Sequence, residues 1–242
     1  EEDSGRSQFQ RFASAMEQAL RATSGPFFLG PGLSTADLVF VPYVERMAAS
    51  LAYYKGFGLR QEHPGIGAWF AALEQRSTYL GTQSDFHTHA HDLPPQMGGC
   101  YGNSSAAANY WAARIDAGPW HNLSDAGSPA PGSNPATEAL GRVIKHRRTL
   151  LEHTPGLSDA ALRAALTRLV TDDPCAPPPN SDLGLRNLRD RICVPRDMGI
   201  HAARLLRAAL EQTAALGGSR LPAALPRRHR RDQNPAPFLV HS

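Results

Sequence analysis

The chain has 242 residues, enough for one large or two modest domains with a buried core. Its hydrophobic fraction of 41% is ordinary for a globular protein, and its net charge of +3 is too small to indicate a general nucleic-acid-binding surface. No apolar run approaches the roughly 20 residues that a membrane-spanning helix requires, so we expect neither nucleic acid nor membrane as a partner.

The first predicted element is an amphipathic helix over residues 7–23. Ser24-Gly25-Pro26 ends it, because glycine and proline both interrupt helices. The acidic start Glu1-Glu2-Asp3 is unlike the basic region of a signal peptide, and we expect the natural chain to continue upstream. The apolar residues of this helix recur at spacings of three and four: Phe9, Phe12, Ala13, Met16, Ala19 and Leu20.

A helix start at Ser34 is the clearest local signal. Ser34 is a preferred N-cap residue, and Asp37 three places later can accept from the free amides of the first turn. The spacing predicts a helix to about residue 54, kinked at Pro42. We assign Ser34 and Asp37 a structural capping role rather than a catalytic one. The predicted buried stripe of this helix consists of Leu38, Val41, Val44, Ala48 and Leu51.

The rest of the chain also shows helical periodicity, so the predicted fold class is all-α. His63-Pro64 opens a third helix, and a short turn follows over residues 78–82. Residues 84–102 are expected to be irregular because they contain Pro94-Pro95 and Gly98-Gly99. Further helices are predicted over residues 104–117, 134–152, 158–170, 182–193 and 197–216. We therefore divide the chain into a helical domain (1–97), a helical extension (98–219) and a basic tail (220–242).

Several motifs in this order resemble the helical domain of cytosolic glutathione transferases. They are Gly25-Pro-Phe-Phe-Leu-Gly, Leu33-Ser-Thr-Ala-Asp-Leu, Pro42 with Arg46, and the later run from His63-Pro64 through Trp69-Phe and Leu73 to Arg76. Ser77 stands where that family usually has proline. The resemblance covers residues 7–85. The run from Gln83 to Gln96 and the later Val194-Pro-Arg-Asp-Met198 resemble the iota type of photosynthetic organisms, which carries a long C-terminal appendage.

The resemblance implies an N-terminally truncated helical domain whose thioredoxin-like partner domain is absent. Glutathione, the cosubstrate of the full-length protein, would bind on that domain, so no catalytic residue and no cofactor is assigned to this chain. The implied partners are the thioredoxin-like domain, a second copy in a homodimer, and a small electrophilic or glutathionylated substrate. The implied location is intracellular, in cytoplasm or plastid.

Tyr43, Met47 and Tyr54 lie on or near the central helix. In transferases an apolar substrate pocket forms between the two domains, so the resemblance makes these residues candidate substrate contacts. Aromatic residues at helical spacing are more often part of a core, and that alternative stays open.

His87, His89 and His91 are weak candidates for metal ligands. In an extended segment, residues two apart project to one face, and imidazole suits zinc, copper or nickel. No other residues have metal-site spacing, so we expect a structural segment and no metal site. Cys100, Cys175 and Cys193 are widely separated and are expected to be reduced thiols.

Two functions stay open from the sequence. One is part of an enzyme that conjugates glutathione or reduces glutathionylated substrates. The other is a non-catalytic interaction or scaffold module on the same fold, since a fold does not determine its function.

Overall fold

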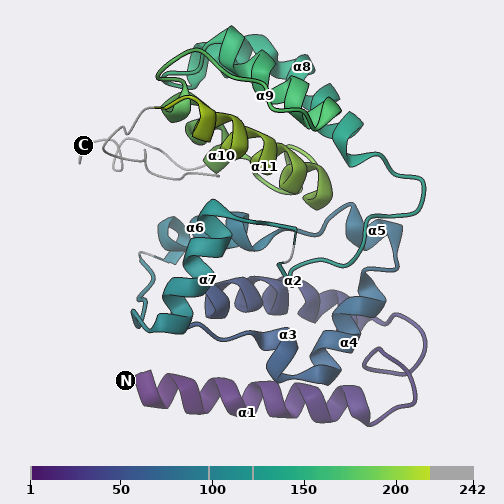
Figure 1. Ribbon diagram of the computed structural model, residues 1–242. Helices are drawn as coiled ribbons and strands as arrows, with labels where there is room; N and C mark the ends of the chain where they lie inside the picture. The colour runs from purple at the N-terminus through teal and green to yellow at the C-terminus, as the bar shows by residue number, and fades with distance from the viewer. Residues whose placement is uncertain (1, 98, 122, 219–242) are drawn as a thin grey trace. The chain divides into compact units, whose positions relative to one another are not determined.

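A computed structural model describes residues 2–97, 99–121 and 123–218 (Figure 1). Within these residues the elements are helical, and the one β-type contact is an isolated bridge between Phe27 and Gly30. The predicted all-α fold class is confirmed. The elements are α1 (Glu2–Arg21), α2 (Thr35–Ser50), η1 (Leu51–Lys55), α3 (Leu59–Glu62), α4 (Pro64–Leu73), α5 (Ser77–Leu80), α6 (Phe86–Met97), α7 (Ala106–Ala117), α8 (Pro135–His153), α9 (Asp159–Thr171), α10 (Asp182–Arg191) and α11 (Ile200–Leu216).

The chain divides into two compact units, each with its own core. Unit 1 comprises residues 1–90 and 101–133, and unit 2 comprises residues 91–100 and 134–242. This division differs from the predicted domains 1–97 and 98–219, because residues 101–133 pack with the first helices. The predicted tail, 220–242, lies outside the described residues.

Helix α6 occupies a segment that was predicted to be irregular, and that prediction is wrong. Two carboxylates hold its first turn: the amide of Thr88 donates to Asp85 Oδ1 (2.8 Å), and the amide of Phe86 donates to Asp125 Oδ2 (2.8 Å). Negative charge at this end also suits the helix dipole. The helix is thus stabilised in part by a residue 39 positions away, which no local pattern reveals.

Asp37 is the polar centre of unit 1. Its Oδ2 accepts from the amide of Ser34 (2.8 Å), which is one half of the capping box of α2, and also from the Ser34 hydroxyl (2.6 Å). Its Oδ1 accepts from the amide of Phe28 (3.1 Å) and from the indole of Trp69 (2.8 Å). This buried carboxylate therefore joins the start of α2 to the preceding loop and to α4.

The buried stripe of α2 is narrower than predicted. Val44 and Ala48 are buried as expected, but Leu38 is 58% exposed. The reason is that Asp37, not Leu38, turns inward toward Trp69, which leaves the next side chain on the outer face. Pro42 lies inside α2 as predicted.

Helix α1 caps helix α4 with a side chain. Glu17 accepts from the amides of Gly65 (2.8 Å) and Ile66 (3.1 Å), two of the unpaired donors in the first turn of α4. Arg21, one turn later on α1, forms an ion pair with Glu17 (2.7 Å). These bonds hold α1 against the rest of unit 1. Apolar contacts, such as the one between Phe9 and Phe57, do the same.

A π-helical turn, η1, continues the chain after α2. It ends at Gly56, whose φ of +69° lies in the left-handed region. A Cβ at Gly56 would lie 2.4 Å from the backbone nitrogen of Ala108, so only glycine permits this close approach to α7. Single π-helical turns occur frequently at functional sites, and this one presents Tyr53 and Tyr54.

In unit 2, helix α11 contacts α8, α9 and α10. Ile200, Ala203, Leu206 and Leu210 are buried, as its amphipathic pattern predicts. The buried Arg189 of α10 forms an ion pair with the half-buried Glu211 of α11, and it also bonds Asp190 within its own helix (2.7 Å).

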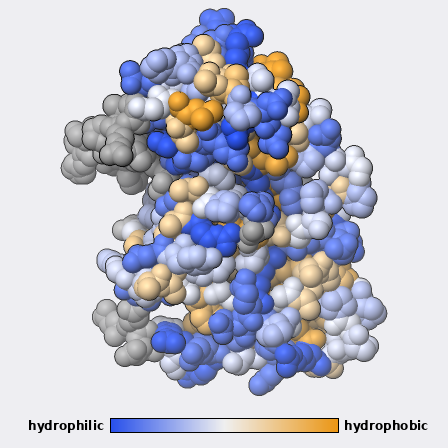
Figure 2. Space-filling view, in the orientation of Figure 1, coloured by the Kyte–Doolittle hydropathy of each residue, from blue (hydrophilic) through white to orange (hydrophobic). Residues whose placement is uncertain are grey.

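An apolar groove runs between α8 and α9. Figure 2 shows apolar side chains gathered on the surface of this part of unit 2. Arg147 (2.5 Å) and Arg163 (2.8 Å) form ion pairs with Asp159 at its rim. The apolar residues that line the groove are Leu140, Ile144, Leu162, Leu166 and Val170.

Candidate functional site

Histidines and carboxylates gather around the first turns of α6. His87 is buried, and His89 and His91 are half-buried. The sequence argument placed all three imidazoles on one face of an extended segment. In a helix, residues i and i+4 share a face while residue i+2 points away from it. His87 and His91 are therefore grouped, and His89 is directed elsewhere.

His89 belongs to a polar cluster centred on Glu45 of α2. Glu45 Oε1 lies 2.8 Å from His89 Nε2 and accepts from the amide of Ser84 (3.0 Å). Glu45 Oε2 accepts from the hydroxyl of Tyr79 (2.6 Å). Burial, together with the negative charge of Glu45, raises the pKa of Tyr79 above its usual range, so this hydroxyl stays a donor. The cluster ties α2, α5 and α6 together, which is a structural role.

Asp116 of α7 makes a separate bond within unit 1. The hydroxyl of Tyr53, on η1, donates to Asp116 Oδ2 (2.9 Å) and holds that carboxylate in place. This bond joins η1 to α7.

The side chain of Tyr54 donates a hydrogen bond to a backbone carbonyl of α6 that Pro94 cannot pair within the helix. Pro94 has no N–H, so it cannot make the helical hydrogen bond to the carbonyl of Ala90. The Tyr54 hydroxyl donates to that carbonyl instead (2.8 Å). Tyr54 also packs edge-on against Tyr53, with ring centroids 4.8 Å apart. Tyr54, a candidate substrate contact, therefore also makes a hydrogen bond that supports the fold.

The other two candidate substrate contacts lie on α2. Tyr43 is 67% exposed, and Met47, one turn further along the helix, is half-buried. Leu38, Val39 and Phe40 are also exposed apolar residues near the start of α2, which makes this helix unusually apolar on its outer side.

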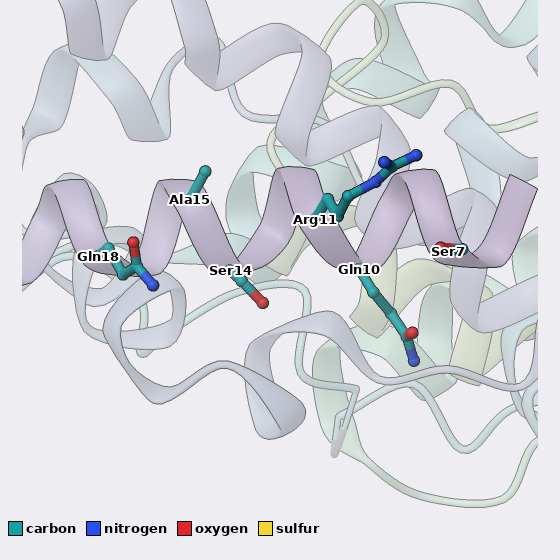
Figure 3. Close-up of a pocket in the computed structure, with 6 residues that line it drawn as sticks. All are labelled: Ser7, Gln10, Arg11, Ser14, Ala15 and Gln18. Carbon is teal, nitrogen blue, oxygen red and sulfur yellow. The ribbon is translucent and has the colours of Figure 1, made fainter.

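A shallow hollow on α1 has no residue from any other element (Figure 3). A site needs groups that converge from several elements, so we assign no function to this hollow. Its lining residues are Ser7, Gln10, Arg11, Ser14, Ala15 and Gln18.

Sequence reasoning missed Glu45, which bonds His89, and Asp116, which accepts from Tyr53. Glu45 and Asp116 are separated from the histidines by more than 20 residues, and no spacing rule links them. The sequence did contain a partial signal for the start of α6. Asp85 is a preferred N-cap residue type, and it accepts from the amide of Thr88 three residues later.

The match to a known family lies in unit 1. Residues 2–72 match the profile of the family described as glutathione S-transferase, C-terminal domain. This stretch contains the Ser34–Asp37 capping box and the bonds from Asp37 to the loop and to Trp69. Residues 2–72 are therefore similar to the C-terminal domain of glutathione S-transferases.

Two plant proteins are similar to part of this chain. One, from Oryza sativa subsp. japonica, is described as a probable glutathione S-transferase DHAR1, cytosolic, and is 30% identical over 70 residues. The other, from Arabidopsis thaliana, is described as glutathione S-transferase L3 and is 32% identical over 71 residues.

The aligned stretch is 29% of this chain in both cases, and 32% and 30% of the two relatives. The chain therefore spans about a third of the length of the curated relatives it matches. No solved structure matches the chain. Among the described helices, none combines the length and the apolar character needed to cross a membrane.

Proposed function

We propose that this chain supplies the substrate-side helical domain of a glutathione transferase-like protein. In the proposal a thioredoxin-like domain holds glutathione, and the joined protein either conjugates it to small electrophiles or transfers thiols from glutathionylated substrates. The observation that carries the proposal is the match of residues 2–72 to the transferase C-terminal domain, together with the capping network around Asp37.

The exposed apolar residues of α2 support a partner domain. Leu38, Val39, Phe40 and Tyr43 are 58%, 53%, 37% and 67% exposed. Covering such residues is favourable by about 25 cal/mol per Å² of apolar surface removed from water. We infer that the thioredoxin-like domain covers part of this surface and that Tyr43 and Met47 face the substrate. A homodimer and an intracellular location belong to the same proposal.

In conjugation, the glutathione sulfur forms a bond to the electrophilic carbon while the leaving group departs with the electron pair of its own bond. The thiol proton passes to solvent. The group that lowers the thiol pKa is assigned to the thioredoxin-like domain, so the role of this chain is to position the electrophile.

The test compares substrate kinetics in the protein that carries both domains. Tyr43→Ala and Met47→Ala should each raise KM for an aromatic electrophile by about 5-fold or more, since each removes apolar contact worth about 1 kcal/mol or more. KM for glutathione should not change. Tyr110→Ala, at an exposed tyrosine on α7, is the matched control. Unchanged electrophile kinetics in both variants would remove Tyr43 and Met47 from the site, and absence of both turnover and glutathione binding would favour a scaffold.

A further inference from the structure

Two rows of apolar side chains line the groove between α8 and α9, which lie side by side in unit 2 (Figure 1). The α8 row is Leu140 and Ile144, and the α9 row is Leu162, Leu166 and Val170. Residues four apart share one face of a helix, so the α9 row runs for about 12 Å, or two helical turns. The groove lies outside residues 2–72, the stretch that matches the transferase profile.

The edges of this groove expose apolar surface to water. Ile144 is 57% exposed on α8 and Val170 is 58% exposed on α9, whereas Leu162 is fully buried at the floor of the groove. Exposed apolar residues that gather in one place, rather than lie scattered, mark sites of interaction. The groove holds about 660 Å³, but its lining residues come from two helices, so a small molecule would keep much of its surface in water. A helix laid along the groove would contact both rows.

The charge of α8 and α9 is unbalanced. The two helices carry six arginine and lysine residues but three carboxylates. The basic residues are Arg142, Lys145, Arg147, Arg148, Arg163 and Arg168, and the acidic residues are Glu138, Glu152 and Asp159. An excess of positive charge around a groove favours a negatively charged partner.

The groove itself is lined by two arginines and one carboxylate. Asp159 forms ion pairs with both Arg147 and Arg163, so two guanidinium groups share one negative charge. Hydrogen bonds from Arg163 and Arg147 lower the pKa of Asp159, and this residue therefore stays ionised. The three side chains together leave a net positive charge at the rim of the groove.

The other two carboxylates of these helices are also bonded within unit 2. Glu138 accepts from the amide of Gly199 (2.8 Å), and Glu152 forms an ion pair with Arg148 (2.8 Å). Among the residues that the structure describes, Lys145 has no ion-pair partner, and it directly follows Ile144 in the α8 row. Its ammonium group is therefore available to a partner.

We propose that the α8–α9 groove binds an amphipathic helix of a partner protein whose apolar stripe is flanked by glutamate or aspartate residues. The stripe packs against the two apolar rows, as helices with apolar residues at i, i+3 or i+4 and i+7 do in hydrophobic grooves. The flanking carboxylates pair with Arg147 and Arg163, which have one carboxylate between them. Lys145 adds to the positive field that attracts such a helix.

Charge counts against the other occupants of this groove. Two copies of the chain that joined through it would face each other with the same excess of positive charge. The chain's own tail, residues 220–242, has five arginines and is repelled in the same way. A flat anionic membrane surface would meet the carboxylate of Asp159 and could not reach Leu162 at the floor of the groove.

The experiment measures the binding of fluorescently labelled synthetic peptides to the full chain by anisotropy. One probe is a helical peptide of about 15 residues with a leucine stripe and glutamates on both sides of it, and the second probe has lysines in place of the glutamates. We expect saturable one-to-one binding of the glutamate peptide, and the binding should weaken with added salt. The lysine peptide should bind more weakly by about 10-fold or more.

Variants of the chain locate the binding surface. Ile144→Asp and Val170→Asp each place a carboxylate in the apolar groove, and each should weaken binding of the glutamate peptide by about 10-fold or more. Leu205→Asp, at a 44% exposed position on α11, is the matched control and should bind as the wild type does. Arg163→Gln should weaken binding about 5-fold, and Arg191→Gln, at an exposed arginine of α10, should leave it unchanged.

The proposal fails if the glutamate peptide does not bind, if the lysine peptide binds as tightly, or if Ile144→Asp and Val170→Asp both bind as the wild type does. Sedimentation velocity tests a second copy as the occupant. A dimer that Ile144→Asp dissociates would replace the partner helix by another copy of this chain. Binding to phosphatidylserine vesicles that the same variant abolishes would replace it by a membrane surface.

Discussion

At the scale of single residues, Asp37 shows how one buried charge can organise a domain. Burial alone raises the pKa of Asp37, but hydrogen bonds from Ser34, Phe28 and Trp69 outweigh it and hold the pKa below its ordinary range. A carboxylate that accepts several bonds inside a protein stabilises the fold only while it is ionised. The capping role expected from the sequence is therefore part of a larger bonding role, which the sequence did not reveal.

Asp37→Asn should lower the free energy of unfolding by about 2 kcal/mol or more, because the amide has one accepting oxygen instead of two. Its NH2 group must then face either the donors of Ser34 or those of Phe28 and Trp69. Ser34→Ala should cost about 1 kcal/mol. Urea unfolding at pH 7 measures both. Asp173→Asn, at an exposed loop position, is the control and should be silent. Equal stability of Asp37→Asn and the control would refute the role given to Asp37.

The same carboxylate should make the fold sensitive to acid. Its folded-state pKa lies below the unfolded value of about 3.9, so its contribution is complete above that value. The contribution is lost as pH falls through the folded-state pKa. The wild type should therefore lose stability more steeply than Asp37→Asn below about pH 4. Parallel stability curves for the two proteins would contradict the lowered pKa.

At the scale of elements, α6 separates what local sequence can predict from what it cannot. The other long helices follow the apolar spacing of their residues and lie within a few positions of their predicted ends. Helix α6 contains Pro94 and Pro95, which local rules associate with loops. It forms because Asp125 holds its first turn and Tyr54 pairs with the carbonyl of Ala90. Both partners are distant in sequence.

The placement of the histidines follows from the same element. Once residues 86–97 are a helix, His87 and His91 share a face, and the sequence pattern alone suffices for that step. Asp116 and Tyr53 could not have been added from the sequence, because their positions depend on how η1 packs against α7.

Tyr54→Phe should loosen α6 without unfolding unit 1. The change leaves the carbonyl of Ala90 without the phenol donor, and we expect a loss of about 1 kcal/mol. Hydrogen exchange of the backbone amides in residues 86–97 should become faster. Tyr43→Phe removes an exposed hydroxyl and serves as the control. Unchanged exchange in α6 would show that Tyr54 does not support that helix.

At the scale of the whole molecule, the two units have separate cores that can be followed with different signals. Trp69, Trp111 and Trp120 all belong to unit 1, so tryptophan fluorescence reports on that unit. Far-UV circular dichroism reports on the helices of both units.

Leu206→Ala in unit 2 and Leu73→Ala in unit 1 form a matched pair of core truncations. Both leucines are almost fully buried, and each change should cost about 2–5 kcal/mol. Thermal melting of Leu206→Ala should show an early loss of circular dichroism that tryptophan fluorescence does not follow. Leu73→Ala should move the fluorescence transition to lower temperature. Coincident signals in both variants would mean that the two cores unfold as one.

The cap that Glu17 places on α4 limits how the protein can be shortened. Any form that begins after Glu17 leaves the amides of Gly65 and Ile66 without their acceptor and also removes Arg21's ion-pair partner. Such a form should aggregate during expression, because the side chains of α4 that α1 covers become exposed. A deletion series for biophysical work should therefore retain Phe9 and everything after it.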